Sequence, residues 1–332
     1  MVCKKFKTVC LLVYLVMMQT VVWAAVLLPD FAPPERGQQV VINVPQLKLF
    51  LYQDGVLLKS YDVAVGTNRT KTPLGEYHIG GKAYKPTWVV PKSIQKEMEA
   101  KGQEVLKTVK YGEPRHPLGP VFVRLGDPKL GLGIHGTNAP ASVPGVRSHG
   151  CVRMKSPNAL DFAKSVESGS DASVIYQLAG LNADDAENLW LAAYPDPYFQ
   201  KNLDKTALIN SINDWAQNRG LTVDHKLVAL VLKNRSSKLN CITCNGKQSV
   251  SGSLKAINWQ SGLGTLVQAK PIEETPELLP GFGHEVLPEG DSVEVETEAA
   301  AEPVSSFAVP VIREQKSIPV LPIKARPLFP EQ

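Results

Sequence analysis

A short stretch of the chain combines two histidines, a cysteine and several glycines. Residues 135–154 read HGTNAPASVPGVRSHGCVRM, in which His135 and His149 precede Cys151. A cysteine attacks a carbonyl as its thiolate, and a nearby imidazole can remove the thiol proton. These residue types therefore predict nucleophilic catalysis by a thiol with an imidazole base.

Either histidine could supply the base. His149 is two positions before Cys151, so both side chains would point the same way in an extended strand, unless the chain turns at Gly150. His135 is separated from the cysteine by the loop at 138–145, and such a separation sets no limit on the geometry of the pair. We expect His135 to be the base.

Two alternatives give these residues no nucleophilic role. They could bind zinc, but structural zinc sites commonly have four ligands, and the stretch offers no fourth unless His116 or His78 contributes. Cys151 could instead be a core thiol, because free cysteine is among the most buried residue types. The polar, glycine-rich surroundings favour catalysis, and we expect no metal and no cofactor.

The blocks HGTN and SHGCVRM resemble the signature of the L,D-transpeptidase family, also called YkuD-domain proteins, and a looser resemblance covers residues 40–176. It implies a mainly β catalytic domain, a YkuD-like β-sandwich with short helices. In that family the cysteine attacks a peptidoglycan stem peptide and releases D-alanine. An amine then takes the acyl group: diaminopimelate, which gives 3-3 cross-links, or the lysine of an outer-membrane lipoprotein.

Carried over residue by residue, the resemblance makes Cys151 the nucleophile, His135 its acid and base, and the Gly136 carbonyl the group that orients the imidazole. The oxyanion hole and its surroundings fall on Ser148, His149 and Gly150. Substrate binding falls on Arg153 and Asn138.

Arg153 departs from the pattern, because many members have asparagine there and the periplasmic branch often has arginine. A guanidinium binds carboxylates bidentately, so Arg153 could pair with a stem carboxylate, or it could form a structural salt bridge. An arginine at this position is expected to affect recognition of the acceptor rather than the acyl-transfer reaction itself.

Other functions stay open. The same cleft could hold stem peptides without catalysis, water could replace the amine in an L,D-carboxypeptidase, or a zinc hydrolase could act on the same polymer. The formal net charge is only +4, with no concentrated basic run beyond residue 10. Nucleic-acid binding therefore has no support.

The N-terminus has the pattern of a secretory signal. Lysines at 4, 5 and 7 precede an apolar run at 9–22, and small residues follow, which predicts cleavage after Ala24. An uncleaved membrane anchor is the alternative. We expect export to a periplasm of the Gram-negative type, where Cys241 and Cys244 form a local disulfide and Cys151 is left as the odd thiol. A redox-active CxxC motif of the thioredoxin type is the alternative.

With 332 residues and a hydrophobic content of 43%, the chain is long enough for a catalytic domain with additions. Alternating apolar residues and the turn at 53–55 predict strands at 40–44, 47–52 and 56–65. Ser156 is expected to cap a helix, and helical periodicity is expected at 92–101, 184–194, 205–219 and 225–232. The predicted organisation is a signal peptide at 1–24, a catalytic domain at 38–178, a small helical accessory region with the CxxC motif at 180–268, and a disordered Pro/Glu-rich tail at 269–332.

Overall fold

The fold comes from a computed structural model that describes residues 26–244 and 249–259. The expected signal peptide at 1–24 and the expected tail at 269–332 lie outside these residues. Among the described helices, none is both long and apolar enough to cross a membrane.

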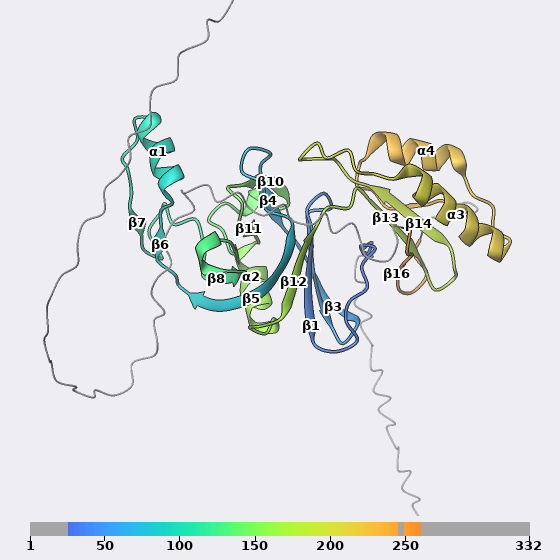
Figure 1. The fold of residues 1–332 in the computed structure, drawn as a ribbon, viewed down its shortest axis with the longest axis horizontal. Coiled ribbons are helices and arrows are strands. Elements are labelled where there is room, and N and C mark those ends of the chain that lie inside the picture. Colours follow the sequence, from blue (N-terminus) through green and yellow to red (C-terminus); the bar gives the residue numbers. More distant parts are fainter. Residues whose placement is uncertain (1–25, 245–248, 260–332) are drawn as a thin grey trace, which may run out of the picture. The chain divides into compact units, whose positions relative to one another are not determined.

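Ten strands between residues 38 and 175 form one curled sheet (Figure 1). Its strand order is β10-β4-β11-β9-β8-β5-β12-β1-β2-β3. The strands are β1 Gln38–Asn43, β2 Lys48–Gln53, β3 Val56–Asp62, β4 Ala64–Gly66, β5 Gly75–Tyr84, β8 Val121–Leu125, β9 Gly133–His135, β10 Gly145–Ser148, β11 Val152–Arg153 and β12 Asp171–Ile175. The expected mainly β fold is confirmed, and the hairpin of β2 and β3 turns at Asp54 and Gly55 as predicted.

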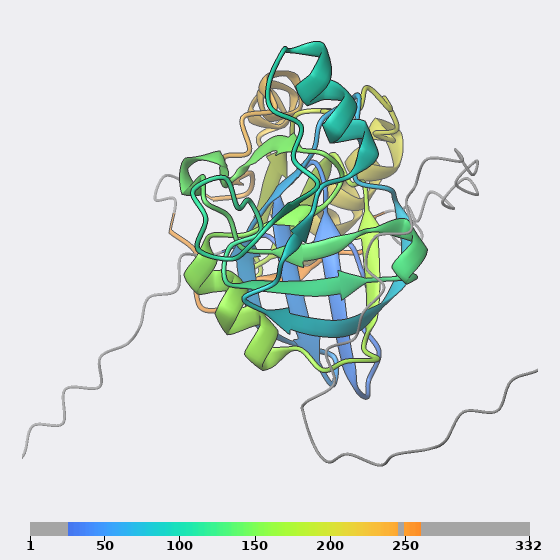
Figure 2. The ribbon, with the colours of Figure 1, turned by 90° about the vertical axis from the view of Figure 1, so that its left-hand side faces the viewer.

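Strand β5 belongs to both halves of the curled sheet. Its first residues pair with β12 and its last with β8, and the register shifts between Ile79 and Lys82, around two consecutive glycines. A bulge of this kind bends a strand and increases its twist. The strands beyond the bend therefore run across β1 and β2 (Figure 2), and the two halves share one apolar core.

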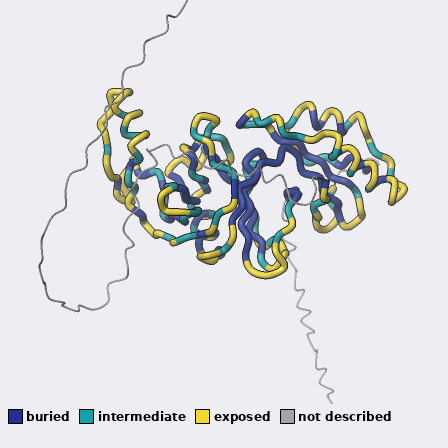
Figure 3. The backbone as a smooth tube through the Cα atoms, in the orientation of Figure 1, coloured by how far each residue is buried: buried dark blue, intermediate teal, exposed yellow. Residues whose placement is uncertain are grey.

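Three shorter elements flank the sheet around the site. Helix α2, Ser156–Ser165, packs three buried side chains against the sheet, whereas α1, Lys92–Ala100, buries none and is exposed in Figure 3. Strand β6, Trp88–Val89, precedes α1 in the sequence, and β7, Thr108–Val109, follows it. The two strands pair with each other. The 3-10 turns are η1 Pro128–Leu130 and η2 Pro140–Ser142.

The expectation that Ser156 caps α2 is wrong. The helix begins at Ser156 itself, with Lys155 in the capping position. The Ser156 hydroxyl instead donates to the Thr137 carbonyl at 3.0 Å and accepts from the Thr137 N–H at 3.3 Å. A tertiary contact to the loop after His135 has replaced the local cap.

The accessory region, which was expected to be helical, also contains strands. A four-stranded sheet, in the order β15-β14-β13-β16, precedes and accompanies its two helices. The strands are β13 Ala179–Ala183, β14 Leu189–Ala193, β15 Asn240–Cys241 and β16 Lys255–Ala256. Helices α3, Lys205–Arg219, and α4, His225–Asn234, occur where helices were predicted, with aspartates 204 and 224 as N-caps and Gly220 in the left-handed conformation at the end of α3.

The segment predicted as a helix at 184–194 is a turn followed by β14. Every residue of β14 is buried, since alternate side chains pack against α3 and α4 on one face and against Leu27 and its neighbours on the other. A strand buried on both faces has no alternating pattern, and its apolar run resembles a helix face.

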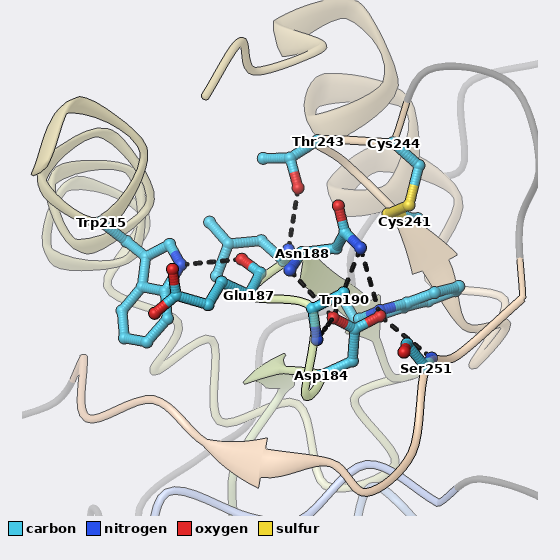
Figure 4. Close-up of a disulfide and its surroundings, with 11 residues drawn as sticks. Asp184, Glu187, Asn188, Trp190, Trp215, Cys241, Thr243, Cys244 and Ser251 are labelled. Atoms are coloured by element: carbon cyan, nitrogen blue, oxygen red, sulfur yellow. Dashed lines mark hydrogen bonds between the residues drawn. A yellow bond between two sulfur atoms is a disulfide. The ribbon is translucent and has the colours of Figure 1, made fainter. Parts of the chain in front are cut away.

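Asp184 stabilises the turn that precedes β14. Its carboxylate accepts from the backbone N–H of Asn188 at 2.9 Å, the indole N–H of Trp190 at 3.0 Å and the backbone N–H of Ser251 at 3.1 Å (Figure 4). These donors hold the pKa of Asp184 below its usual value against the opposing effect of burial, which is the largest single influence. The disulfide between Cys241 and Cys244 lies beside this turn, at the end of β15.

Candidate active site

Strand pairing brings the two motif blocks together. Strand β9 ends at His135 and runs parallel to β11, so Ile134 is opposite Val152 and His135 is opposite Arg153. Cys151 immediately precedes β11. The nucleophile candidate and the imidazole are therefore presented from neighbouring strands of one sheet.

Close packing fixes the path of β9. Gly133 lies against the ring of Phe122, and a Cβ at this glycine would be 2.1 Å from the nearest ring carbon. The Phe122 ring also stacks on the imidazole of His135, with centroids 6.1 Å apart. A larger residue at 133 would therefore displace the strand that carries His135.

The imidazole of His135 is buried and oriented by a backbone carbonyl. Its Nδ1 lies 2.6 Å from the carbonyl oxygen of Gly136. A carbonyl only accepts hydrogen bonds, so Nδ1 holds the proton of the neutral ring and Nε2 keeps its lone pair. Gly136 is itself required by close packing, since a Cβ there would lie 2.9 Å from Cδ of Pro120.

Burial keeps both reacting groups neutral. It lowers the pKa of His135 to about 4, against the opposing effect of the Gly136 carbonyl and with a further lowering by the cation of Arg153. Burial likewise raises the pKa of the Cys151 thiol, whereas the backbone of Gly133 and the charge of Arg153 act to lower it. The resting site therefore favours a thiol and a neutral imidazole over a thiolate–imidazolium pair.

Cys151 is the free cysteine among the described residues, and it is half-buried. Its sulfur lies 3.5 Å from the carbonyl oxygen of Gly131. The turn before it is held by Ser148, whose hydroxyl donates to the Cys151 carbonyl and accepts from the Gly150 N–H at 3.2 Å. Gly150 has φ +116°, a conformation that other residues rarely adopt.

A cleft of about 370 Å³ opens above these groups. His135, Cys151 and Arg153 line its floor side, together with residues from the segment at 88–94. The charged side chains that line it in the described part of the chain are cationic or imidazole groups: Lys71, Lys129, Arg153, His135 and His149. The cleft therefore suits a ligand that carries negative charge.

Arg153 lies partly buried in the cleft. Burial lowers the pKa of its guanidinium from its usual value, and the nearby Cys151 opposes this effect. Its Nε is buried without a hydrogen-bond partner among the described residues. Arg153 lines the cleft, so its guanidinium is available to pair with a carboxylate there.

Not every residue predicted for the site is brought into it. Asn138 is exposed and donates to the Pro114 carbonyl at 3.4 Å, and it is absent from the described residues that line the cleft. His149 lines the cleft but is exposed, with Nε2 3.5 Å from a carboxylate oxygen of Glu97 on α1. This position makes His149 a residue of the cleft rim.

The other two histidines that could have completed a zinc site have partners elsewhere. His116 Nε2 lies 2.7 Å from the Pro86 carbonyl, and His78 Nδ1 lies 2.8 Å from an Asp171 carboxylate oxygen. Within the described ranges, no three metal-binding side chains converge.

Three residues of the site region were not predicted as site residues. Lys71 and Lys129 line the cleft from loops that carry no recognisable motif. Thr72 donates from its hydroxyl to the Gly150 carbonyl at 2.8 Å. Only the TPLGEY pattern, which resembles a segment of the L,D-transpeptidase family, could have drawn attention to Thr72.

Comparison with known proteins finds similarity to L,D-transpeptidases. Residues 37–175 match the model of the L,D-transpeptidase catalytic domain, YkuD. The Bacillus licheniformis protein YkuD, named as an L,D-transpeptidase, is 28% identical over 151 residues, which are 45% of this chain and 73% of that protein. The Escherichia coli protein YcfS, also named as an L,D-transpeptidase, is 29% identical over 152 residues, 45% of this chain and 46% of YcfS.

A solved L,D-transpeptidase from Mycobacterium smegmatis is 21% identical, with a TM-score of 0.33, and the match covers 41% of this chain and 58% of that one. The matched part thus spans less than two thirds of YcfS and of this solved structure. The similarity to the L,D-transpeptidase catalytic domain model is confined to residues 37–175.

Proposed function

We propose that this chain is a peptidoglycan L,D-transpeptidase in which Cys151 is the nucleophile and His135 the general acid and base. The observation that supports this most is that both residues line one cleft on neighbouring strands, with Nδ1 of His135 occupied by the Gly136 carbonyl. The lone pair of Nε2 is then available to take the thiol proton.

The first step would form a thioester. The Cys151 sulfur attacks the carbonyl at the L-centre of diaminopimelate in a tetrapeptide stem, while its proton passes to His135 Nε2. The N–H of Cys151 is a candidate donor to the resulting oxyanion, since the Gly150 N–H already donates to Ser148. The C–N bond to the terminal D-alanine then breaks, and His135 returns the proton to the departing amine.

The second step would transfer the acyl group to an amine. The amine attacks the thioester, His135 takes its proton, and the restored thiol leaves as the new amide forms. A diaminopimelate amine would give a 3-3 cross-link, and the lysine of an outer-membrane lipoprotein would anchor that protein. Water as acceptor would make the enzyme an L,D-carboxypeptidase. No step needs a metal or an organic cofactor.

The charge of the cleft supports an anionic peptide as substrate. Lys71, Lys129 and Arg153 line it, and the guanidinium of Arg153 could pair with a stem carboxylate. The apolar N-terminal run predicts export, so we place the reaction in the periplasm, with membrane attachment only if that run is not removed.

The test is Cys151→Ala in purified protein incubated with disaccharide-tetrapeptide. The parent should release D-alanine and the variant should not, whereas release at the parent rate by the variant would refute the assignment. A carbapenem should add its mass to the parent at Cys151 and leave the variant unmodified.

The same experiment separates the alternatives. A non-catalytic binding module would retain muropeptides but give neither product nor adduct. A zinc hydrolase would lose activity on chelation, whereas the thiol mechanism would not. Product analysis with and without an added amine distinguishes transpeptidation from hydrolysis by water.

A further inference from the structure

A tyrosine from the accessory region is hydrogen-bonded to a loop that contacts the candidate active site. Tyr198, in the loop between β14 and α3, is 4% exposed. Its hydroxyl donates to the Gly66 carbonyl at 3.0 Å and accepts from the Thr72 N–H at 2.9 Å. It therefore joins the two ends of the loop at 66–72, which belongs to the catalytic domain.

That loop holds the backbone just before the nucleophile. The Thr72 hydroxyl accepts from the Gly66 N–H at 2.8 Å and donates to the Gly150 carbonyl at 2.8 Å. The Thr67 N–H donates to the Ser148 carbonyl at 3.1 Å. The loop thus connects Tyr198 to the turn that precedes Cys151.

The bond from Thr72 to Gly150 has a geometric consequence. The Gly150 carbonyl and the Cys151 N–H belong to the same planar peptide unit, in which they point in opposite directions. Gly150 has φ +116° and lacks a Cβ, so its own conformational preference restrains this unit weakly. Fixing the carbonyl therefore fixes the direction of the Cys151 N–H.

Tyr198 is itself held firmly. Its ring stacks on Tyr176 with centroids 5.4 Å apart, and its backbone N–H donates to the Tyr176 hydroxyl at 2.8 Å. That hydroxyl donates to Asp196, which also accepts from the backbone N–H groups of Gln200 and Lys201. The loop that presents Tyr198 is thus ordered by its own hydrogen bonds.

We propose that Tyr198 is a positioning residue that orients the Cys151 N–H toward the oxyanion, acting through Thr72 and the Gly150 carbonyl. The inference rests on the proposed acyl-transfer function. It assigns the accessory region a part in catalysis, because the hydroxyl that completes the arrangement comes from outside the matched domain at 37–175.

The test compares Tyr198→Phe with Tyr194→Phe in the full chain. Tyr194 is also a buried accessory tyrosine, but its hydroxyl has no hydrogen-bond partner among the described residues. Two rates are measured at a temperature where circular dichroism shows all variants folded: acylation of Cys151 by a carbapenem and alkylation of Cys151 by iodoacetamide. Alkylation forms no oxyanion, so it reports on the thiol and His135 alone.

Tyr198→Phe should slow acylation about tenfold, less than the roughly 100-fold or more that loss of an oxyanion donor costs. Its alkylation rate should stay within about twofold of the parent, and Tyr194→Phe should match the parent in both rates. Thr72→Val should slow acylation at least as much, and adding Tyr198→Phe to it should cause no further loss, because both act through one path.

Any of three results would overturn the positioning role. Tyr198→Phe could be acylated at the parent rate, or its acylation and alkylation rates could fall equally. The losses of acylation rate caused by Tyr198→Phe and Thr72→Val could also prove additive in the double variant. If the parent itself forms no acyl-enzyme with a carbapenem or a tetrapeptide, the proposed function fails instead. The two failures are therefore distinguishable.

Discussion

His135 and Arg153 are register partners across the parallel strands β9 and β11, which places an imidazole and a guanidinium side by side at the cleft. The cation opposes protonation of the ring, and burial opposes it more strongly. This arrangement keeps His135 neutral, as a general base must be before it accepts a proton.

The pH dependence of acylation should reflect this neutral ring. With a His135 pKa of about 4, the acidic limb of kcat/KM should lie near pH 4, well below the ordinary histidine value of 6.5. His135→Gln should lower the acylation rate by roughly 100-fold or more. An acidic limb near pH 6.5 that disappears in this variant would contradict the neutral, buried imidazole.

The same pKa affects stability. Between about pH 6.5 and 4 the unfolded chain binds a proton at His135 that the folded chain does not, so the free energy of unfolding should fall as the pH drops through this window. His135→Gln should remove the contribution of this histidine to the dependence of the free energy of unfolding on pH. Urea titrations of parent and variant at pH 7, 5.5 and 4 measure this difference. If the free energy of unfolding depended on pH equally in the two proteins, the lowered pKa of His135 would be contradicted.

Arg153→Gln tests the recognition of a substrate carboxylate. Because Arg153 lines the cleft, KM for the tetrapeptide should rise about tenfold or more, since hydrogen bonds to charged groups contribute roughly 1.5–3 kcal/mol. Arg147→Gln is the control, because Arg147 is exposed and not among the described residues that line the cleft. If Arg153 formed only a structural salt bridge, the variant would lose stability and keep its KM.

Gly133→Ala should disturb the strand that carries His135. The added Cβ would meet the Phe122 ring at 2.1 Å, and overpacking of this kind costs roughly 1–3 kcal/mol. Gly81→Ala, where a Cβ has no neighbour within 4 Å, should have a much smaller effect. Thermal unfolding compares the two, and equal melting temperatures would refute the close packing at β9.

The disulfide should be separable from catalysis. Replacing both Cys241 and Cys244 by serine removes a short closed loop, for which the chain-entropy model gives a loss of about 2 kcal/mol. The carbapenem should still acylate Cys151 in this variant. In protein without residues 1–24, a thiol titration in denaturant should find one thiol before reduction and three afterwards.

Local patterns predicted much of this molecule. The hairpin at Asp54 and Gly55 and the helices α3 and α4 follow from residues adjacent in sequence, because turns and helical turns are made by neighbouring backbone groups. The blocks around His135 and Cys151 were recognisable for a related reason, since the chemistry restricts residue types over a few positions.

Only the tertiary structure decided the rest. Strand β14 could not be told from a helix because its burial on both faces depends on partners far along the chain. The exclusion of Asn138 from the cleft and the contact of Tyr198 with Thr72 likewise depend on how separate segments pack. The sequence alone indicated which residues could react, whereas long-range packing determined which groups surround and orient them, because such contacts leave no periodic trace among neighbouring residues.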